Sequence, residues 1–428
     1  MRLLLLMPTT TYRADDFVAA ADKMGVEIVF GSDRCHVLEG QGAVTFSRES
    51  LALDFLDPDA AAQAISDFAS RKPIDGVVAV DDATTVIAAL AAQKLGMRHN
   101  PPDAAAASRD KLRLRERFAK GGVRQARFRD FPVTASPADA AREAATNPRF
   151  PCVLKPRMLS ASRGVIRAND ETEFAAAFAR IARILADPEL KARSGEASAT
   201  ILVESFVPGP EVALEGLLTN GELEVLALFD KPDPLDGPFF EETYYVTPSR
   251  HPLALQQAII AETAKATTAL GITEGPVHAE LRLATSGPHV LEIAARSIGG
   301  LCARTLRFGT GMSLEEVVVR HAVRKPGWPA ATAAADKTPA GVLMIPITHT
   351  GVFRGVEGLD DARAVPGIAE ITITAIEGRE LHALPEGNSY LGFMFARAAT
   401  PEAVESALRA AHAKLRVSIA AGLRQSSP

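Results

Sequence analysis

Two lysines and a loop of small residues are suited to binding phosphate. Lys111 begins a predicted basic helix, and Lys155 ends an apolar strand. A triphosphate carries several negative charges, and lysines at the ends of such elements supply point charges at fixed positions. The loop after Lys155 is rich in Ser, Ala and Gly, so its backbone N–H groups can approach phosphate oxygens closely. The pattern indicates nucleotide chemistry, with the loop represented by Ser160, Ser162 and Gly164.

Two glutamates and an arginine extend this pattern. Glu280 and Glu292 lie on the two arms of a hairpin predicted around residues 286–287, where they can hold Mg²⁺ together with phosphate oxygens. Their alternative role is a structural ion pair, because an unpaired carboxylate in an apolar strand is costly. Arg296, four residues after Glu292, can steady charge on a transferred phosphoryl group or hold a substrate carboxylate. Its alternative role is an ion pair with a nearby acidic residue.

The first hundred residues alternate between predicted strands and helices. We expect strands at 2–7, 26–30 and 76–80, and helices at 15–24, 60–68 and 83–95. This alternation predicts a parallel sheet with helices on both faces. Ligands bind at the carboxyl ends of the strands in such sheets, so Asp81 and Asp82 should face the site. The threonines at 9–11 end another strand, but we favour a plain turn for them.

The rest of the chain is predicted to combine α/β and α+β parts. We expect a helix at 174–185 and strands at 150–156, 201–204, 212–218, 277–283 and 289–293. The stretch 326–339 is rich in Ala and Pro, which is typical of a linker. Strands at 342–347 and 368–374 and a helix at 401–415 then predict a C-terminal α+β domain.

Composition excludes several classes of protein. The 428 residues include 47% hydrophobic and 23% charged side chains, so we expect two or three folded domains and not a disordered chain. The net charge of −5 predicts no broad basic face for nucleic acid. No apolar stretch approaches the ~20 residues that span a bilayer. The three scattered cysteines support neither a zinc site nor a disulfide framework, and they indicate a cytoplasmic protein.

Taken in order, the motifs resemble those of the ATP-grasp superfamily. The matching stretches are SRDKLRLRERF, CVLKPRMLSASRGV, ILVESFVPGPEVALEG, VHAELRL and VLEIAARSIGG. Their order and spacing match from about residue 75 to 310, and the tail resembles the C-terminal region of L-amino acid ligases. The resemblance implies three domains: an N-terminal α/β domain at 1–105, an ATP-grasp domain at 106–325 with a lid at about 120–205, and a C-terminal α+β domain at 337–428.

The resemblance implies a role for each phosphate and metal residue. Lys111 and Lys155 would contact the phosphates of ATP, and residues 160–164 would close over the β- and γ-phosphates. Glu280 and Glu292 would ligate Mg²⁺ or Mn²⁺.

The adenosine residues follow in the same way. Glu204 would face the adenine, with the backbone of Phe206 and Val207 at its edge, and Glu211 would hold the ribose hydroxyls. Considered without the resemblance, Glu204 and Glu211 could be a polar strand end and a turn.

Some residues depart from the family pattern or are open to interpretation. Many relatives have Asn where Ala294 stands, which leaves the number of metal ions open. We predict that His278 is a packed core histidine and that Cys302 is a small buried residue. For the glycines at 299–300 we favour a backbone approach to substrate over a tight turn. For the segment 230–245 we favour a wall of the substrate pocket over a loop packed on the core.

The resemblance implies an ATP-dependent ligase that joins a carboxylate to an amine through an acyl phosphate, with amino acids as substrates. The expected partners are small molecules, not nucleic acid or membrane, and a homodimer is left open. Two alternatives are a carboxylase that activates bicarbonate and a non-catalytic ATP-binding module. The retention of Lys155, Glu280 and Glu292 argues against the module, which would not need metal carboxylates.

Overall fold

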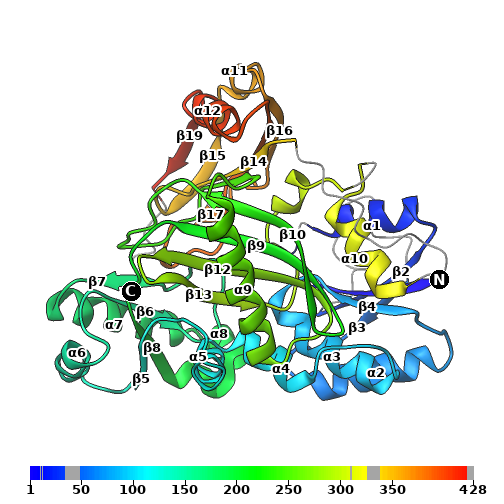
Figure 1. Ribbon diagram of the computed structural model, residues 1–428, viewed down its shortest axis with the longest axis horizontal. Coiled ribbons are helices and arrows are strands. Elements are labelled where there is room, and N and C mark those ends of the chain that lie inside the picture. Colours follow the sequence, from blue (N-terminus) through cyan, green and yellow to red (C-terminus); the bar gives the residue numbers. More distant parts are fainter. Residues whose placement is uncertain (10, 12, 34–48, 309–310, 325–337, 422–428) are drawn as a thin grey trace.

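The computed structural model describes residues 1–9, 11, 13–33, 49–308, 311–324 and 338–421 (Figure 1). Its N-terminal part is a parallel sheet with the strand order β3-β2-β1-β4. These strands are β1 (Arg2–Leu6), β2 (Glu27–Ser32), β3 (Ser50–Ala52) and β4 (Gly76–Ala79). The predicted parallel sheet is confirmed.

Alternate leucines of β1 face two different hydrophobic cores. Leu3 and Leu5 lie in one core, and Leu4 and Leu6 lie in the other. Successive side chains of a strand point to opposite faces, so a continuous apolar run requires cover on both faces of the sheet. The first core is covered by α1 (Ala14–Lys23) and α10 (Leu314–Val323), and the second by α2 (Pro58–Ala69) and α3 (Thr85–Lys94). Helix α10, at residues 314–323, therefore covers a sheet whose strands lie within residues 2–79.

An antiparallel sheet with the order β5-β8-β6-β7 lies within the stretch predicted to be the lid. Its strands are β5 (Phe128–Pro132), β6 (Cys152–Pro156), β7 (Ile166–Ala168) and β8 (Thr200–Ser205). Helices α6 (Pro137–Thr146), α7 (Glu171–Leu185) and α8 (Pro188–Ser194) accompany it. Phe174 and Phe178 of α7 stack with their ring centroids 6.0 Å apart and pack against this sheet. The predicted lid thus has a hydrophobic core of its own.

The central sheet has the order β13-β12-β9-β10-β11-β14-β18-β16. Its strands are β9 (Glu211–Thr219), β10 (Glu222–Lys231), β11 (Tyr244–Thr247), β12 (Gly275–Ala284), β13 (Gly287–Ala294), β14 (Ala340–Ile345), β16 (Ile368–Ile373) and β18 (Gly392–Arg397). One face of its first strands packs on α4 (Pro102–Arg109), α5 (Lys111–Lys120) and α9 (Leu253–Leu270). The hairpin predicted around residues 286–287 is confirmed as β12 and β13.

The C-terminal strands continue this same sheet. Strand β11 pairs with β14, from Tyr244 opposite Leu343 to Thr247 opposite Ala340. A small sheet, β17-β15-β19, and two helices complete this end of the molecule (Figure 1). They are β15 (Gly351–Glu357), β17 (Glu380–Leu381), β19 (Arg416–Ala420), α11 (Leu359–Arg363) and α12 (Pro401–His412). Most of the predicted linker, residues 325–337, lies outside the described residues.

Candidate nucleotide and substrate site

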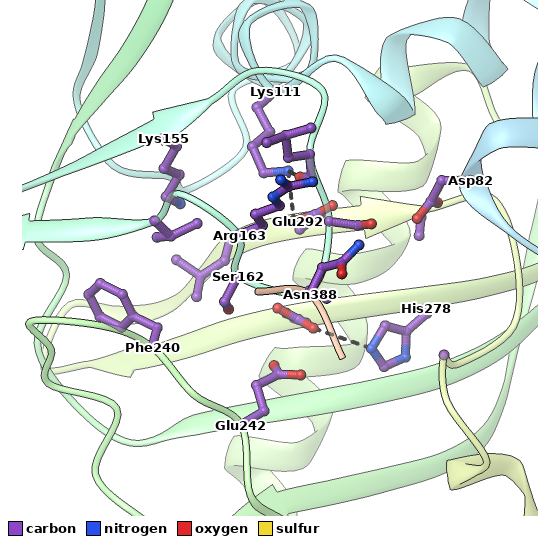
Figure 2. Close-up of a pocket in the computed structure, with 18 of the residues that line it drawn as sticks. Asp82, Lys111, Lys155, Ser162, Arg163, Phe240, Glu242, His278, Glu292 and Asn388 are labelled. Carbon is purple, nitrogen blue, oxygen red and sulfur yellow. Dashed lines mark hydrogen bonds and ion pairs between the residues drawn. The ribbon is translucent and has the colours of Figure 1, made fainter. Parts of the chain in front are cut away.

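One cavity of about 720 Å³ brings the predicted site residues together. Its walls come from the lid, the β12–β13 hairpin, the carboxyl ends of β1 and β4, and the segment before β18 (Figure 2). The predicted residues that line it are Lys111, Lys155, Ser160, Ser162, Glu204, Phe206, Val207, Glu211, Glu280, Glu292 and Arg296. Residues separated by almost 190 positions in sequence therefore share one site.

Gly164 is the predicted site residue that does not line the cavity. Its N–H donates a hydrogen bond to the Pro385 carbonyl at 2.8 Å, so this donor is not available to phosphate. Its φ of +74° favours glycine, and an added Cβ would lie 2.6 Å from Cγ of Pro156. In this structure Gly164 forms a turn that anchors the loop, and its contact with phosphate stays a prediction.

The start of α5 holds Lys111 beside both the loop and the metal hairpin. Asp110 caps the helix by accepting a hydrogen bond from the N–H of Leu112 at 3.0 Å. Lys111 donates from Nζ to the Leu159 carbonyl at 2.7 Å, and this Nζ lies 3.5 Å from Oε2 of Glu292. The helix cap thus places one ammonium between the small-residue loop and a candidate metal ligand.

Lys155 is oriented by a buried carboxylate. Its Nζ lies 2.8 Å from Oε2 of Glu204, whose Oε1 accepts a hydrogen bond from Nε of Arg115 at 2.7 Å. Burial by itself raises the pKa of Glu204, but Arg115 and Lys155 outweigh it and lower the pKa to about 2. Arg115 also donates to the Leu291 carbonyl at 2.7 Å, so it joins the lid to β13. No pattern in the sequence pointed to Arg115 beyond its place in a basic helix.

The candidate adenine edge lies beside Phe206 and Val207. The Phe206 ring stacks against two guanidinium groups, with Cζ of Arg167 4.1 Å and Cζ of Arg282 5.1 Å from its centroid. The Phe206 N–H donates to the Pro151 carbonyl at 2.9 Å. The Val207 N–H has no hydrogen-bond partner within the described part of the chain. Of these two N–H groups, Val207 therefore offers the one that an adenine can use.

A buried lysine lies among three glutamates that line the cavity. Nζ of Lys231 lies 2.6 Å from Oε1 of Glu211 and 3.6 Å from Oε1 of Glu280, and it also contacts Glu242. One oxygen of each glutamate lies within 4.8 Å of the others. Burial raises the pKa of Glu242 to about 7, and the nearby Glu280 adds to this shift while Lys231 opposes it. Lys231 and Glu242 belong to the segment 230–245 but were not singled out from it.

Glu280 and Glu292 face each other across β12 and β13 as predicted. In this structure Glu280 has His278 at 3.4 Å and Lys231 at 3.6 Å, and Glu292 has Lys111 at 3.5 Å, so each carboxylate has a cation beside it. Two facing carboxylates of this kind fit a hard divalent cation that also binds phosphate. Ala294 also lines the cavity, and its methyl group offers no ligand oxygen.

His278 is buried as predicted, but the packed-core interpretation is wrong about its surroundings. Nδ1 lies 3.1 Å from Glu215, and Nε2 lies 3.4 Å from Glu280. Burial by itself lowers the pKa of His278, but hydrogen bonds to Glu215 and Glu280 outweigh it and raise the pKa to about 9. The imidazolium therefore belongs to the charge network around the candidate metal ligands. No pattern in the sequence indicated that Glu215, on the neighbouring strand, would contact His278.

Arg296 forms a bidentate ion pair with the N-terminal sheet. Its Nε and Nη2 donate to the two oxygens of Asp82 at 3.0 and 2.8 Å. Burial raises the pKa of Asp82, but Arg296 outweighs this effect and lowers it. Asp81 also lines the cavity, so the prediction that both carboxylates face the site is confirmed. The ion-pair alternative for Arg296 is present, and the same guanidinium also lines the cavity.

Three family models match successive parts of the chain. They are an ATP-grasp N-terminal domain at 18–98, an ATP-grasp domain at 148–305 and an L-amino acid ligase C-terminal domain at 343–420. The chain belongs to the ATP-grasp superfamily. The predicted mixed α/β architecture of this ATP-grasp chain is also that of its structural neighbours.

Curated relatives of this ATP-grasp protein are distant. Alanine–anticapsin ligase of Bacillus subtilis is 27% identical over 245 residues, which cover 54% of this chain and 50% of the relative. Dapdiamide A synthase of Enterobacter agglomerans is 28% identical over 203 residues, which cover 47% of this chain and 45% of the relative. The chain thus spans about half the length of these relatives.

The fold is also that of a solved ligase structure. L-amino acid ligase from Bacillus licheniformis matches with a TM-score of 0.82 and 24% identity over 98% of both chains. Phosphoribosylglycinamide synthetase from Anaerococcus prevotii matches with a TM-score of 0.68 and 18% identity, over 98% of this chain and 99% of that one. At these identities the two matches establish the shared ATP-grasp fold.

Proposed function

We propose that this ATP-grasp protein is an ATP-dependent carboxylate–amine ligase that joins amino acids. The observation that carries the proposal is the single cavity. It contains Lys111, Lys155, Glu280 and Glu292 for a nucleotide and its metal, and it also contains Arg296 beside a space that a second substrate can enter. The ligase and synthase names of the curated relatives support the same reaction class.

In the proposed reaction, a substrate carboxylate attacks the γ-phosphorus of ATP and displaces ADP. The resulting acyl phosphate is attacked by an amine, which forms the amide and releases phosphate, while the amine loses a proton. The lid and its loop exclude water, because water would hydrolyse the acyl phosphate.

The charged residues of the cavity have different roles in the proposed reaction. Lys111 and Lys155 bind phosphate oxygens, and the lining residues Ser160 and Ser162 belong to the loop that covers them. Glu280 and Glu292 would hold Mg²⁺ or Mn²⁺, which would neutralise part of the phosphate charge. Glu204 keeps Lys155 extended toward the cavity by pairing with its Nζ.

The part of the cavity assigned to the second substrate is lined by aromatic and apolar groups. Tyr245, Tyr390, Met344 and Cys302 line it, together with the backbone of residues 299–300. Burial raises the pKa of the Cys302 thiol to about 12, so this cysteine is an uncharged wall and not a nucleophile at neutral pH. Phe240 and Glu242 line the same cavity, which supports the pocket role proposed for the segment 230–245.

The proposal is tested by a screen of amino-acid pairs for ADP and phosphate release, with the product mass measured. A product heavier than the acid by the amine less one water supports the ligase. Bicarbonate in place of the acid separates the carboxylase alternative. ADP release that needs bicarbonate and no amine would overturn the ligase, and the absence of turnover on every pair would favour the non-catalytic alternative.

Arg296→Lys is expected to impair the acid substrate and not the nucleotide. Lysine keeps the charge but loses the planar fork that holds both oxygens of Asp82. We expect kcat/KM for the acid to fall by about tenfold or more, as loss of one charge-assisted hydrogen bond gives, with near-normal ATP affinity. Steady-state kinetics and calorimetry with an ATP analogue measure the two quantities.

A matched control for this variant is Arg304→Lys. Arg304 makes a similar bidentate pair with Asp16, at 2.9 and 3.0 Å, outside the cavity. It should therefore leave the acid kinetics unchanged. If Arg296→Lys loses ATP affinity but keeps its kinetics with the acid, Arg296 acts on the nucleotide and not on the acid substrate.

The location and assembly of the protein are also proposals. Among the helices of the described residues, none has the length and apolar character needed to cross a membrane. The buried free cysteines Cys152 and Cys302 accord with a cytoplasmic enzyme. The expected substrates are small-molecule acids and amines, and a homodimer is one arrangement that size measurements in solution can test.

A further inference from the structure

A segment of the C-terminal part of the chain reaches the lid. It is the stretch 382–390, which lies between β17 and β18. Arg180 of α7 donates from Nε and Nη2 to the two oxygens of Glu386 at 2.7 and 2.8 Å. The Gly164 N–H, at the end of the small-residue loop, donates to the Pro385 carbonyl at 2.8 Å. Two separate parts of the lid thus hold this segment.

Arg180 also contacts the second segment that lines the cavity. Its Cζ lies 5.2 Å from the centroid of the Phe239 ring, within the segment 230–245. The neighbouring Pro238 carbonyl accepts a hydrogen bond from the N–H of Arg167 in β7 at 2.9 Å. Arg180 therefore lies where the lid, the segment 230–245 and the segment 382–390 meet.

The segment 382–390 carries polar side chains into the cavity. Asn388 and Ser389 line it, and Figure 2 shows Asn388 among the residues that line the cavity. Both residues are exposed, and their side chains make no hydrogen bond to other described residues. Their donors and acceptors are therefore available to a bound substrate or phosphate.

The Arg180–Glu386 pair is strong enough to position the segment and weak enough to open. The two side chains are 37% and 42% exposed, and exposed ion pairs contribute little to stability. The bidentate geometry adds directional specificity, because both carboxylate oxygens are fixed at once. Such a contact can break each time the lid rises and form again when it closes.

We propose that Arg180 is a positioning residue that holds Asn388 and Ser389 over the reaction site through its ion pair with Glu386. When the lid is closed, the C-terminal part of the chain then forms one wall of the active site. We call the ion pair between Arg180 and Glu386 the latch. The expected kinetic effect of the latch rests on the proposed ligase function, but the latch itself is a structural property that can be measured without turnover.

Hydrogen exchange tests the latch on the full-length protein, with and without Mg²⁺ and the ATP analogue AMP-PNP. In the wild type, the analogue should slow exchange in both 158–164 and 382–390. In Arg180→Ala, the segment 382–390 should exchange about threefold to tenfold faster with analogue bound, while protection of 158–164 persists. Arg180→Glu combined with Glu386→Arg should restore the protection, because it rebuilds the ion pair in reverse.

Arg142→Ala is the matched control, since Arg142 is an exposed arginine of the same lid that lies outside the cavity. It should leave exchange in 382–390 unchanged. Unaltered exchange of 382–390 in Arg180→Ala, or a reversed pair that fails to restore protection in a folded protein, would overturn the latch. A wild type that shows the latch but turns over no amino-acid pair would overturn the proposed function alone.

The kinetic consequence separates positioning from general stability. With an active pair of substrates, Arg180→Ala should lower kcat/KM for the acid or the amine by about threefold to tenfold. Affinity for AMP-PNP should stay within about threefold, because Lys111, Lys155 and Val207 are untouched. Equal losses in nucleotide affinity and in substrate kinetics, with no rescue by the reversed pair, would show that Arg180 only stabilises the fold.

Discussion

Glu292→Ala is expected to lower ATP turnover by about a thousandfold or more while the protein stays folded. Glu292 pairs with Glu280 across the hairpin, and we propose that the two residues hold the metal ion together. Removing one of two protein ligands removes charge neutralisation at the transferred phosphoryl group, an effect of several kcal/mol at about 1.4 kcal/mol per tenfold. Lys111 keeps its hydrogen bond to the Leu159 carbonyl, so the loop anchor is not lost with the carboxylate.

ADP release at saturating Mg²⁺ measures this effect, and Mn²⁺ binding in the presence of ADP gives a reading that does not depend on turnover. EDTA should abolish wild-type activity, and Mg²⁺ or Mn²⁺ should restore it. Glu222→Ala is the control, because Glu222 is an exposed glutamate of β10 outside the cavity. Near-wild-type turnover in Glu292→Ala would show that the metal hairpin is misassigned.

Lys155→Ala is expected to weaken nucleotide binding by about tenfold to a hundredfold, the range of one or two charge-assisted hydrogen bonds. The lysine ends β6 at the cavity, where Glu204 fixes its ammonium. Alanine also leaves Glu204 with Arg115 as its remaining cation, so the buried carboxylate keeps a partner and the lid should still fold. Calorimetry with AMP-PNP and Mg²⁺ gives the affinity, and a thermal melt checks the fold.

Two control variants are compared with Lys155→Ala. Cys302→Ala changes a buried side chain in the same cavity and should leave nucleotide affinity near the wild-type value. Lys72→Ala breaks an exposed Lys–Glu contact of 2.6 Å with Glu49, far from the described cavity lining, and should do the same. Equal nucleotide affinities for Lys155→Ala and Cys302→Ala would show that Lys155 does not bind the phosphates.

The local sequence pattern was sufficient to predict the strands and helices that carry the predicted site residues. The continuous apolar run of β1 and the alternation of strands and helices predicted a parallel sheet, which is confirmed. The hairpin prediction placed Glu280 and Glu292 on its two arms, but it did not fix their pairing. They pair because of a register shift between Glu280 and Leu281, since the register of the turn alone would place Leu291 opposite Glu280. The long helix α9 was missed, since its Ala- and Thr-rich sequence shows no clear apolar face and its N-terminus has no side-chain cap.

The residues that sequence reasoning missed act through partners far away in the chain. Arg115 reaches Glu204 across 89 positions, and Arg180 reaches Glu386 across 206. Lys231 and Glu242 lay in a segment that was recognised, but their shared contact with Glu280 requires β10 and β12 to flank β9. A periodic pattern reports the neighbours of a residue along one element, and it carries no information on which element packs beside it.

The sequence by itself determined the chemistry: which lysines, glutamates and arginine are present, at which element ends, and in which order. Only the tertiary structure decided how those charges are shared. It paired Glu204 with Arg115 and Lys155, joined Arg296 to Asp82, and used Gly164 as an anchor for the segment 382–390. The physical reason is that ion pairs and hydrogen bonds act over a few ångströms, so their partners are set by the packing of sheets that only the complete fold brings together.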